Sequence, residues 1–79
     1  MTITIYSKPN CVFCDKAKSM VKNLGFEYEE KMFGKDFSTP DELYEAVGKQ
    51  VRTMPQIIID DKHIGGYNEL VEHFADKGL

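Results

Sequence analysis

The chain has 79 residues and a formal charge of −3, with 42% hydrophobic and 29% charged residues. These values predict one globular domain over residues 1–79 and do not favour nucleic-acid binding, for which a basic chain is usual. Apolar runs such as Ile57–Ile59 are too short to span a membrane, and Met1–Ser7 lacks the pattern of a signal peptide. We therefore expect a cytoplasmic protein that binds neither nucleic acid nor membrane.

The first half of the sequence predicts a strand, a helix and a second strand. Residues Thr2–Tyr6 alternate at a period of two, which is typical of a strand. From Cys11 onward apolar residues recur at helical spacing as far as Gly25, which we expect to end the helix. Phe26–Glu30 predicts a short second strand, and Lys31–Ser38 is irregular. A strand, a helix and a strand in this order indicate a right-handed crossover between parallel strands.

A clear helix start follows the irregular segment. Thr39 suits the capping position, Pro40 suits the first helical position, and Glu42 completes a capping box. Gly48 is expected to end this helix. Its inner face is predicted to consist of Leu43, Ala46 and Val47.

The last part of the sequence predicts a hairpin and a third helix. Pro55–Asp60 has the pattern of a buried strand, and Lys62–Gly65 is expected to pair with it across a turn at Asp60 and Asp61. Asn68 is expected to cap a final helix with an inward face of Leu70, Val71 and Phe74. The predicted fold is therefore α/β, with the order β-α-β-α-β-β-α and a small four-stranded mixed sheet flanked by three helices.

The two cysteines, Cys11 and Cys14, allow three interpretations. A structural disulfide would close a loop of about four residues and remove little chain entropy. A zinc site would need two further ligands, and the candidates His63 and His73 lie at no familiar ligand spacing. A redox pair fits better, because residues three apart on a helix lie about 5–6 Å apart, within the Cα range of a disulfide. A CxxC pair after a first strand, within a βαβ pattern, is typical of thioredoxin-like redox proteins.

The two sulfurs are expected to differ. Cys11 is predicted at a helix N-terminus, where free amide groups and the helix dipole favour negative charge, and Lys8 lies near it in sequence. Thiols in such a setting have pKa values lowered to about 3.5–7.5. Cys11 is therefore the expected nucleophile, easily reached by solvent, while the less exposed Cys14 suits the step that resolves a mixed disulfide.

Two later motifs, taken alone, have ordinary interpretations. Arg52–Gln56 leads into the predicted strand at Pro55–Asp60, and its Pro55 would by base rate be trans. The paired glycines in His63–Leu70 predict either a tight turn or a backbone surface that a ligand approaches closely. Together with the cysteines, however, these motifs form a series in one order: Cys-Val-Phe-Cys at 11–14, Thr-Met-Pro at 53–55 and Gly-Gly-Tyr-Asn at 65–68. Over nearly its whole length the chain resembles the glutaredoxins, and it is similar to their short phage-encoded members.

This resemblance implies the thioredoxin fold and an enzyme that reduces protein disulfides and glutathione mixed disulfides, with glutathione as its reductant and no metal. It implies that Cys11 attacks, that Cys14 resolves and that Pro55 is cis. Residues that match the family's glutathione groove are Lys8, Phe13, Arg52, Thr53, Met54, Pro55, Gly66, Tyr67 and Asn68. Within that groove, Met54 is expected to offer its backbone to the cysteinyl part of glutathione, and residues 66–68 to hold the γ-glutamyl end.

The sequence also departs from the family pattern. Many glutaredoxins read Cys-Pro-Tyr-Cys, whereas this chain has Val12 and Phe13 between its cysteines, which is expected to loosen the helix start and to remove a phenol contact. Asn68 replaces an aspartate or a hydroxyl residue, so a contact from it to the γ-glutamyl amine would lack a full charge. Lys49 is a further candidate, with Lys8 and Arg52, for the positive charge that glutathione carboxylates need.

The expected protein partners are disulfide-bearing or glutathionylated proteins, with ribonucleotide reductase as one client by family analogy, and we expect a monomer. Two alternatives remain open at this stage. One is a thioredoxin-like electron carrier reduced by a flavin reductase, although the Trp usual before the first cysteine of thioredoxins is absent. The other is a glutaredoxin that binds a [2Fe–2S] cluster, whose members most often have Gly or Ser near the cysteines.

Overall fold

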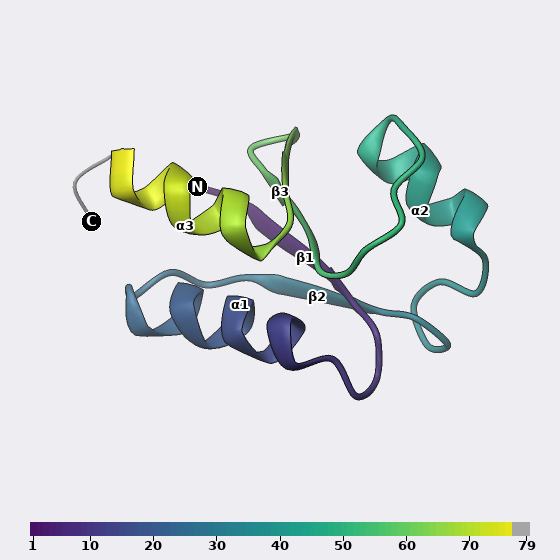
Figure 1. The fold of residues 1–79 in the computed structure, drawn as a ribbon, viewed down its shortest axis with the longest axis horizontal. Coiled ribbons are helices and arrows are strands. Elements are labelled where there is room, and N and C mark those ends of the chain that lie inside the picture. Colours follow the sequence, from purple (N-terminus) through teal and green to yellow (C-terminus); the bar gives the residue numbers. More distant parts are fainter. Residues whose placement is uncertain (77–79) are drawn as a thin grey trace.

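A computed structural model describes residues 1–76 of the chain (Figure 1). Its mixed sheet has the order β2-β1-β3-β4, with bounds β1 (Ile3–Ser7), β2 (Glu29–Met32), β3 (Gln56–Ile59) and β4 (Lys62–Gly65). β1 is parallel to β2 and antiparallel to β3, and β4 is antiparallel to β3. The helices are α1 (Val12–Asn23), α2 (Pro40–Val47) and α3 (Tyr67–Asp76). The predicted order and the four-stranded mixed sheet are confirmed.

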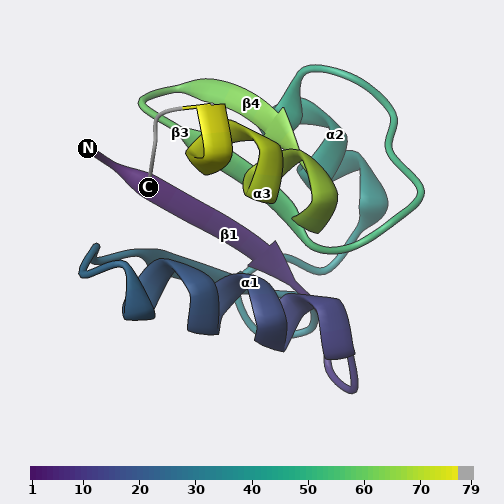
Figure 2. The same cartoon turned by 60° about the vertical axis from the view of Figure 1, so that its left-hand side comes forward.

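The helices cover the two faces of the sheet unequally. Alternate strand residues point to opposite sides, so each face has its own cluster of buried side chains. On one face Ile3 and Ile5 of β1 pack with buried residues of α1 and α3, among them Val21 and Phe74. On the other face a smaller cluster contains Phe37 and two residues of α2, Leu43 and Val47, against which Tyr6 and Ile58 pack. Figure 2 shows α1 and α3 on opposite sides of β1 in projection, with α2 behind the sheet at the far end.

The helix α2 begins as its sequence predicts. The Thr39 hydroxyl accepts a hydrogen bond from the N–H of Glu42, and the Glu42 carboxylate accepts one from the N–H of Thr39 over 2.9 Å. Backbone N–H donors from Ser38 and Thr39 hold the pKa of Glu42 below its ordinary value. At the other end Gly48 adopts a left-handed conformation with φ of 85°, which suits a residue without a side chain. Ala46 was expected to be buried with Leu43 and Val47, but it is exposed.

The second strand lies further along the chain than its pattern predicts. Pairing with β1 begins at Glu29, opposite Thr4, and continues to Met32, within the segment expected to be irregular. The residues before it lie at the edge of the core instead: the half-buried Phe26 stacks on Phe74 of α3, with ring centroids 5.5 Å apart. The predicted bounds of this strand, 26–30, were therefore wrong at both ends. An aromatic residue that packs on the core gives the same sequence pattern as an inward-facing strand residue.

The hairpin between β3 and β4 turns through Asp60 and Asp61, as predicted. Both residues have positive φ, 51° and 64°, which is typical of a two-residue type I′ turn. Asp60 also binds the start of the chain: its carboxylate accepts the N–H of Thr2 over 2.8 Å, and its own N–H donates to the Thr2 carbonyl over 2.8 Å. The N-terminal end of β1 is thereby fixed to this turn.

The last helix begins two residues earlier than expected, because a cap at Asn68 implies a first helical residue at Glu69. α3 starts at Tyr67, so Asn68 lies inside its first turn and does not cap it. Leu70 and Phe74, four residues apart, are fully buried, whereas Val71 is 37% exposed because it lies off that face of the helix. β3 likewise begins at Gln56 and ends at Ile59, so Pro55 and Asp60, which were expected within the strand, lie just outside it.

Candidate active site

The centre of the candidate site is a disulfide between Cys11 and Cys14, whose Cα atoms lie 5.2 Å apart. β1 ends at Ser7, a short turn containing Asn10 at φ of 56° reverses the chain, and α1 begins directly after Cys11. Cys11 is 9% exposed and Cys14 is 1% exposed. Cys11 is therefore more exposed than Cys14, as expected. Cys11 was also expected to be easily reached by solvent, but it is largely buried when the disulfide is formed.

Cys11 is the N-cap of α1, and its sulfur takes the place of a capping oxygen. The N–H of Cys14 points at the Cys11 Sγ over 3.2 Å, and the N–H of Asp15 donates to the Cys11 carbonyl over 3.2 Å. A sulfur in this position faces the unpaired amide groups and the positive end of the helix dipole. This arrangement can stabilise a negative charge on Cys11 once the disulfide is reduced.

The peptide bond between Met54 and Pro55 is cis, as the resemblance to glutaredoxins implies. The Met54 carbonyl oxygen lies 3.7 Å from the Sγ of Cys11, although the two residues are 43 positions apart in sequence. The loop before β3 and the start of α1 therefore meet at the Cys11 sulfur.

A hydrogen-bond network behind this loop was missed from the sequence. The side-chain amide of Gln56, which is buried, donates to the Thr53 carbonyl over 2.7 Å, and its oxygen lies 2.7 Å from Nε2 of His63. Burial lowers the pKa of His63, the positive charge of Lys49 lowers it further, and Glu69 opposes both. A neutral His63 then donates its Nε2–H to Gln56, so β4 supports the loop that carries Thr53 and Met54.

A small groove of about 200 Å³ begins beside the disulfide. It brings together seven of the nine residues expected to bind glutathione: Phe13, Thr53, Met54, Pro55, Gly66, Tyr67 and Asn68. Its two aromatic residues, Phe13 and Tyr67, have ring centroids 5.9 Å apart, and the Lys16 ammonium lies 5.2 Å from the Phe13 ring. We call this the polar groove, because its lining is less apolar than that of the larger groove described below. The remaining two residues, Lys8 and Arg52, line a second groove that shares Thr53 and Met54 with it.

Glu69 also lines the polar groove and was not predicted from the sequence. Its carboxylate accepts the N–H of Gly66 over 2.7 Å. Glu69 is the third residue of α3, the position from which a glutamate reaches back to the residue that precedes a helix. The spacing from Gly66 to Glu69 is thus the signal that reveals this contact. A side chain at Gly65 would place its Cβ 2.8 Å from Cγ of Glu69, which explains the glycine there.

Two other properties concern metal binding and membrane spanning. Within residues 1–76, no group of three or more His, Cys, Asp or Glu side chains is arranged to hold a metal ion. Among the helices of the same residues, none combines the length and the apolar character that crossing a membrane requires.

Comparison with known proteins gives consistent results. The glutaredoxin family model matches residues 3–64. A glutaredoxin of Haemophilus influenzae is 37% identical over 71 residues, which cover 84% of this chain and 82% of that protein. The reduced glutaredoxin of Escherichia coli has a similar structure, with a TM-score of 0.84, 30% identity, and coverage of 96% of this chain and 95% of the other. A buckwheat glutaredoxin–glutathione complex has a TM-score of 0.77 and 26% identity, with coverage of 98% of this chain and 71% of the other.

Proposed function

This chain belongs to the glutaredoxin family and has its thioredoxin fold, and from that premise we propose that it is a glutathione-dependent disulfide oxidoreductase. The family and the Cys11–Cys14 pair make it a dithiol redox protein. The observation that carries the glutathione-dependent activity is the position of the Cys11 sulfur. It lies at the N-terminus of α1 and 3.7 Å from the carbonyl of Met54, a residue that lines the polar groove.

The reaction that we propose begins at the Cys11 thiolate. With a glutathione mixed disulfide, Cys11 attacks the glutathione sulfur, and the substrate leaves as a thiolate. A second glutathione thiolate then attacks the Cys11–glutathione disulfide, which releases oxidised glutathione and restores the Cys11 thiolate. One free glutathione is thus consumed per turnover, because the other half of the oxidised glutathione comes from the substrate itself, and Cys14 has no essential part in this route.

With a protein disulfide, both cysteines take part. Cys11 forms a mixed disulfide with one substrate sulfur and releases the other as a thiolate. Cys14 then attacks the Cys11 sulfur, which frees the substrate in its reduced form and leaves the Cys11–Cys14 disulfide that the structure contains. Two glutathione molecules reduce that disulfide. The burial of Cys14 one helical turn inside Cys11 supports its role as the resolving residue.

The polar groove offers polar groups that glutathione can use. Met54 presents its backbone beside the Cys11 sulfur, where the cysteinyl part of a bound glutathione must lie. The first turn of α3, at Tyr67 and Asn68, offers backbone amide groups and the positive end of a helix dipole to a carboxylate. The buckwheat relative forms a complex with glutathione, which supports the same ligand for this chain.

The remaining expectations belong to the same proposal. Residues 1–79 act as one domain and as a cytoplasmic monomer, and the protein substrates are disulfide-bearing or glutathionylated proteins, with ribonucleotide reductase as one client. The alternative electron donor is a flavin-containing thioredoxin reductase. A third possibility, a shared [2Fe–2S] cluster, predicts a brown protein with visible absorbance after anaerobic purification, and a colourless preparation would dismiss it.

One pair of assays tests the proposed function. The mixed disulfide of glutathione and 2-mercaptoethanol serves as substrate, with glutathione, glutathione reductase and NADPH in one reaction and thioredoxin reductase with NADPH in the other. We expect NADPH oxidation that depends on this protein in the first reaction and a much slower rate in the second. The reverse result would identify a thioredoxin-like carrier, and no activity in either reaction would overturn the proposal.

A further inference from the structure

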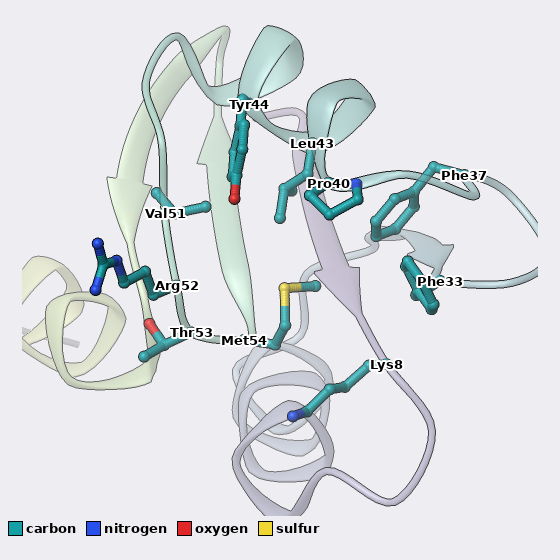
Figure 3. Close-up of a pocket in the computed structure, with 10 residues that line it drawn as sticks. All are labelled: Lys8, Phe33, Phe37, Pro40, Leu43, Tyr44, Val51, Arg52, Thr53 and Met54. Carbon is teal, nitrogen blue, oxygen red and sulfur yellow. The ribbon is translucent and has the colours of Figure 1, made fainter.

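A second groove, larger than the polar groove, lies on the other side of Met54 (Figure 3). Its volume is about 420 Å³, and we call it the apolar groove. Leu43, Tyr44 and Pro40 of α2 form one wall and point toward the Met54 side chain in Figure 3. Phe33 and Phe37 form the end of the groove, with ring centroids 5.5 Å apart.

The walls of this groove are apolar and include exposed aromatic surface. Phe33 is 42% exposed, although a large hydrophobic side chain usually gains free energy from burial. Its neighbour Phe37 is buried and packs edge-on against Tyr6, with ring centroids 5.6 Å apart, so the groove has a fixed base. An exposed apolar surface on a firm base is typical of an interaction site.

The charges at the rim are positive in a chain that is negative overall. Lys8 and Arg52 line the apolar groove, and none of the residues that line it is acidic, whereas the whole chain has a formal charge of −3. Lys8 forms no ion pair with any of residues 1–76, and its ammonium lies near the base of Met54 in Figure 3. Arg52 directs its guanidinium away from the groove. The end nearest Met54 therefore favours a negatively charged group beside an apolar one.

The apolar groove is continuous with the reactive sulfur. Met54 lines both grooves, and its carbonyl lies 3.7 Å from the Cys11 Sγ. A polypeptide joined to Cys11 through a disulfide must leave that sulfur beside Met54. An extended chain advances about 3.3–3.6 Å per residue, so side chains within about two residues of the substrate cysteine reach the apolar groove.

We propose that the apolar groove binds protein substrates, and that it selects an extended segment with an aromatic or leucine side chain about two residues from the substrate cysteine and an acidic residue beside that cysteine. This inference rests on the proposed function and adds the class of protein substrate. The two grooves then bind different ligands: the polar groove binds glutathione, and the apolar groove binds the polypeptide whose disulfide is reduced.

Short synthetic peptides with two cysteines joined in a disulfide test the proposal. One peptide has a phenylalanine two positions from the first cysteine and a glutamate next to that cysteine. Two matched peptides replace the phenylalanine with alanine, or the glutamate with lysine. We expect kcat/KM for the first peptide, with glutathione as reductant, to exceed that for the alanine peptide about tenfold, as burial of an aromatic side chain would give. Equal values for all three peptides would overturn the proposal.

Variants of the groove provide the second comparison. Phe33→Ala and Tyr44→Ala remove exposed parts of its walls, and Val71→Ala removes a comparable apolar side chain from the surface of α3. We expect the first two variants to lose most of the peptide preference and to keep the rate with the small glutathione mixed disulfide. Val71→Ala should keep both. Unchanged preference in Phe33→Ala and Tyr44→Ala would contradict the proposal.

A binding measurement separates this inference from the proposed function. The phenylalanine peptide with serines in place of its cysteines is titrated into the oxidised protein and followed by amide NMR shifts. We expect shifts at Phe33, Tyr44 and Val51, and none at Asn68 in the polar groove. Shifts confined to the polar groove would overturn the inference. If the small mixed disulfide is not reduced at all, the proposed function fails, and the NMR titration still decides whether peptides bind here.

Discussion

The backbone N–H of Cys14 points at the Cys11 sulfur over 3.2 Å, so the residue that would resolve a mixed disulfide also stabilises the sulfur that would form it. The contact follows from the position of Cys11 as the N-cap of α1, where a side-chain acceptor normally meets the N–H of the second or third helical residue. A thiolate at Cys11 would accept the same hydrogen bond more strongly, because a charged acceptor strengthens it.

This relationship predicts that the two thiols of the reduced protein react at different rates. We expect iodoacetamide near neutral pH to alkylate Cys11 well before Cys14, because Cys11 has the amide donor and the greater exposure. Peptide mass spectrometry at short reaction times gives the ratio of the two products. A preference for Cys14, or a rate at Cys11 equal to that of an unstructured thiol, would contradict the assignment of the nucleophile.

Serine substitutions test the two roles directly. We expect Cys11→Ser to abolish reduction of both glutathione mixed disulfides and protein disulfides, because it removes the sulfur that makes the first attack in both proposed routes. Cys14→Ser should retain part of the activity with glutathione mixed disulfides, because a second glutathione completes that route, and should lose activity with protein disulfides. Steady-state rates with one substrate of each kind measure the difference. Equal losses from the two substitutions would show that the roles are wrongly divided.

The capping box of α2 predicts a loss of stability when it is broken. Thr39→Ala removes the hydroxyl that accepts the Glu42 N–H, and we expect the free energy of unfolding to fall by about 0.5–2 kcal/mol. Urea unfolding followed by circular dichroism measures this change. Ser19→Ala, at an exposed position of α1, is the matched control and should not destabilise the protein. A stability of Thr39→Ala equal to that of the parent would mean that the cap contributes nothing.

His63 predicts a pH dependence of stability. Its pKa is lowered in the folded protein, chiefly by burial, so the folded state favours the neutral ring. The unfolded chain then binds a proton at higher pH than the folded one, and stability is fully present above the ordinary histidine pKa of about 6.5 and falls as the pH decreases below it. His63→Gln should reduce this fall. Urea midpoints between pH 8 and pH 5, with NMR titration of the ring, provide the measurement, and a ring that titrates above the ordinary value would refute the explanation.

The conformation and surroundings of Gly65 predict that a side chain at this position destabilises the protein. Its φ is 125°, and an added Cβ would lie 2.8 Å from Cγ of Glu69. We expect Gly65→Ala to lower the free energy of unfolding by about 1–3 kcal/mol, the usual cost of such a backbone conformation for other residues. Gly25→Ala is an informative comparison, because Gly25 has a positive φ of 87° but open space around it. Equal losses would assign the whole effect to the backbone, and a larger loss at Gly65 would show the contribution of Glu69.

The parts of the fold that the sequence predicted best are those fixed by local chemistry. The capping box at Thr39, the turn at Asp60 and Asp61, and the start of α1 at the cysteines all depend on residues close together in the chain. The second strand was placed wrongly because its bounds depend on pairing with β1, and pairing is a long-range property. The predictions that Ala46 and Val71 face inward were wrong for the same reason. The surface against which a helix packs decides which of its residues are buried.

In the candidate site, too, features set by nearby residues could be predicted and features set by long-range contacts could not. Cys11 and Cys14 are apparent from their spacing, whereas the cis bond before Pro55 could be expected only from the resemblance to glutaredoxins. The network through Gln56 and His63 joins residues on two strands and has no signature in the sequence. The apolar groove was also missed, because Phe33 and Phe37 come from a segment without a regular pattern and meet α2 only in the folded chain.

The pair of hydrogen bonds between Thr2 and Asp60 fixes the start of the chain at the end of β1 that faces away from the cysteines (Figure 1). The five residues of β1 separate that end from the turn before Cys11 by about 16 Å. A fluorescent label, a carrier protein or a surface linker attached through Met1 would therefore leave both grooves open to small and large disulfides. Immobilised in this way, the protein would present its redox centre outward, in an orientation suited to capturing substrates from solution.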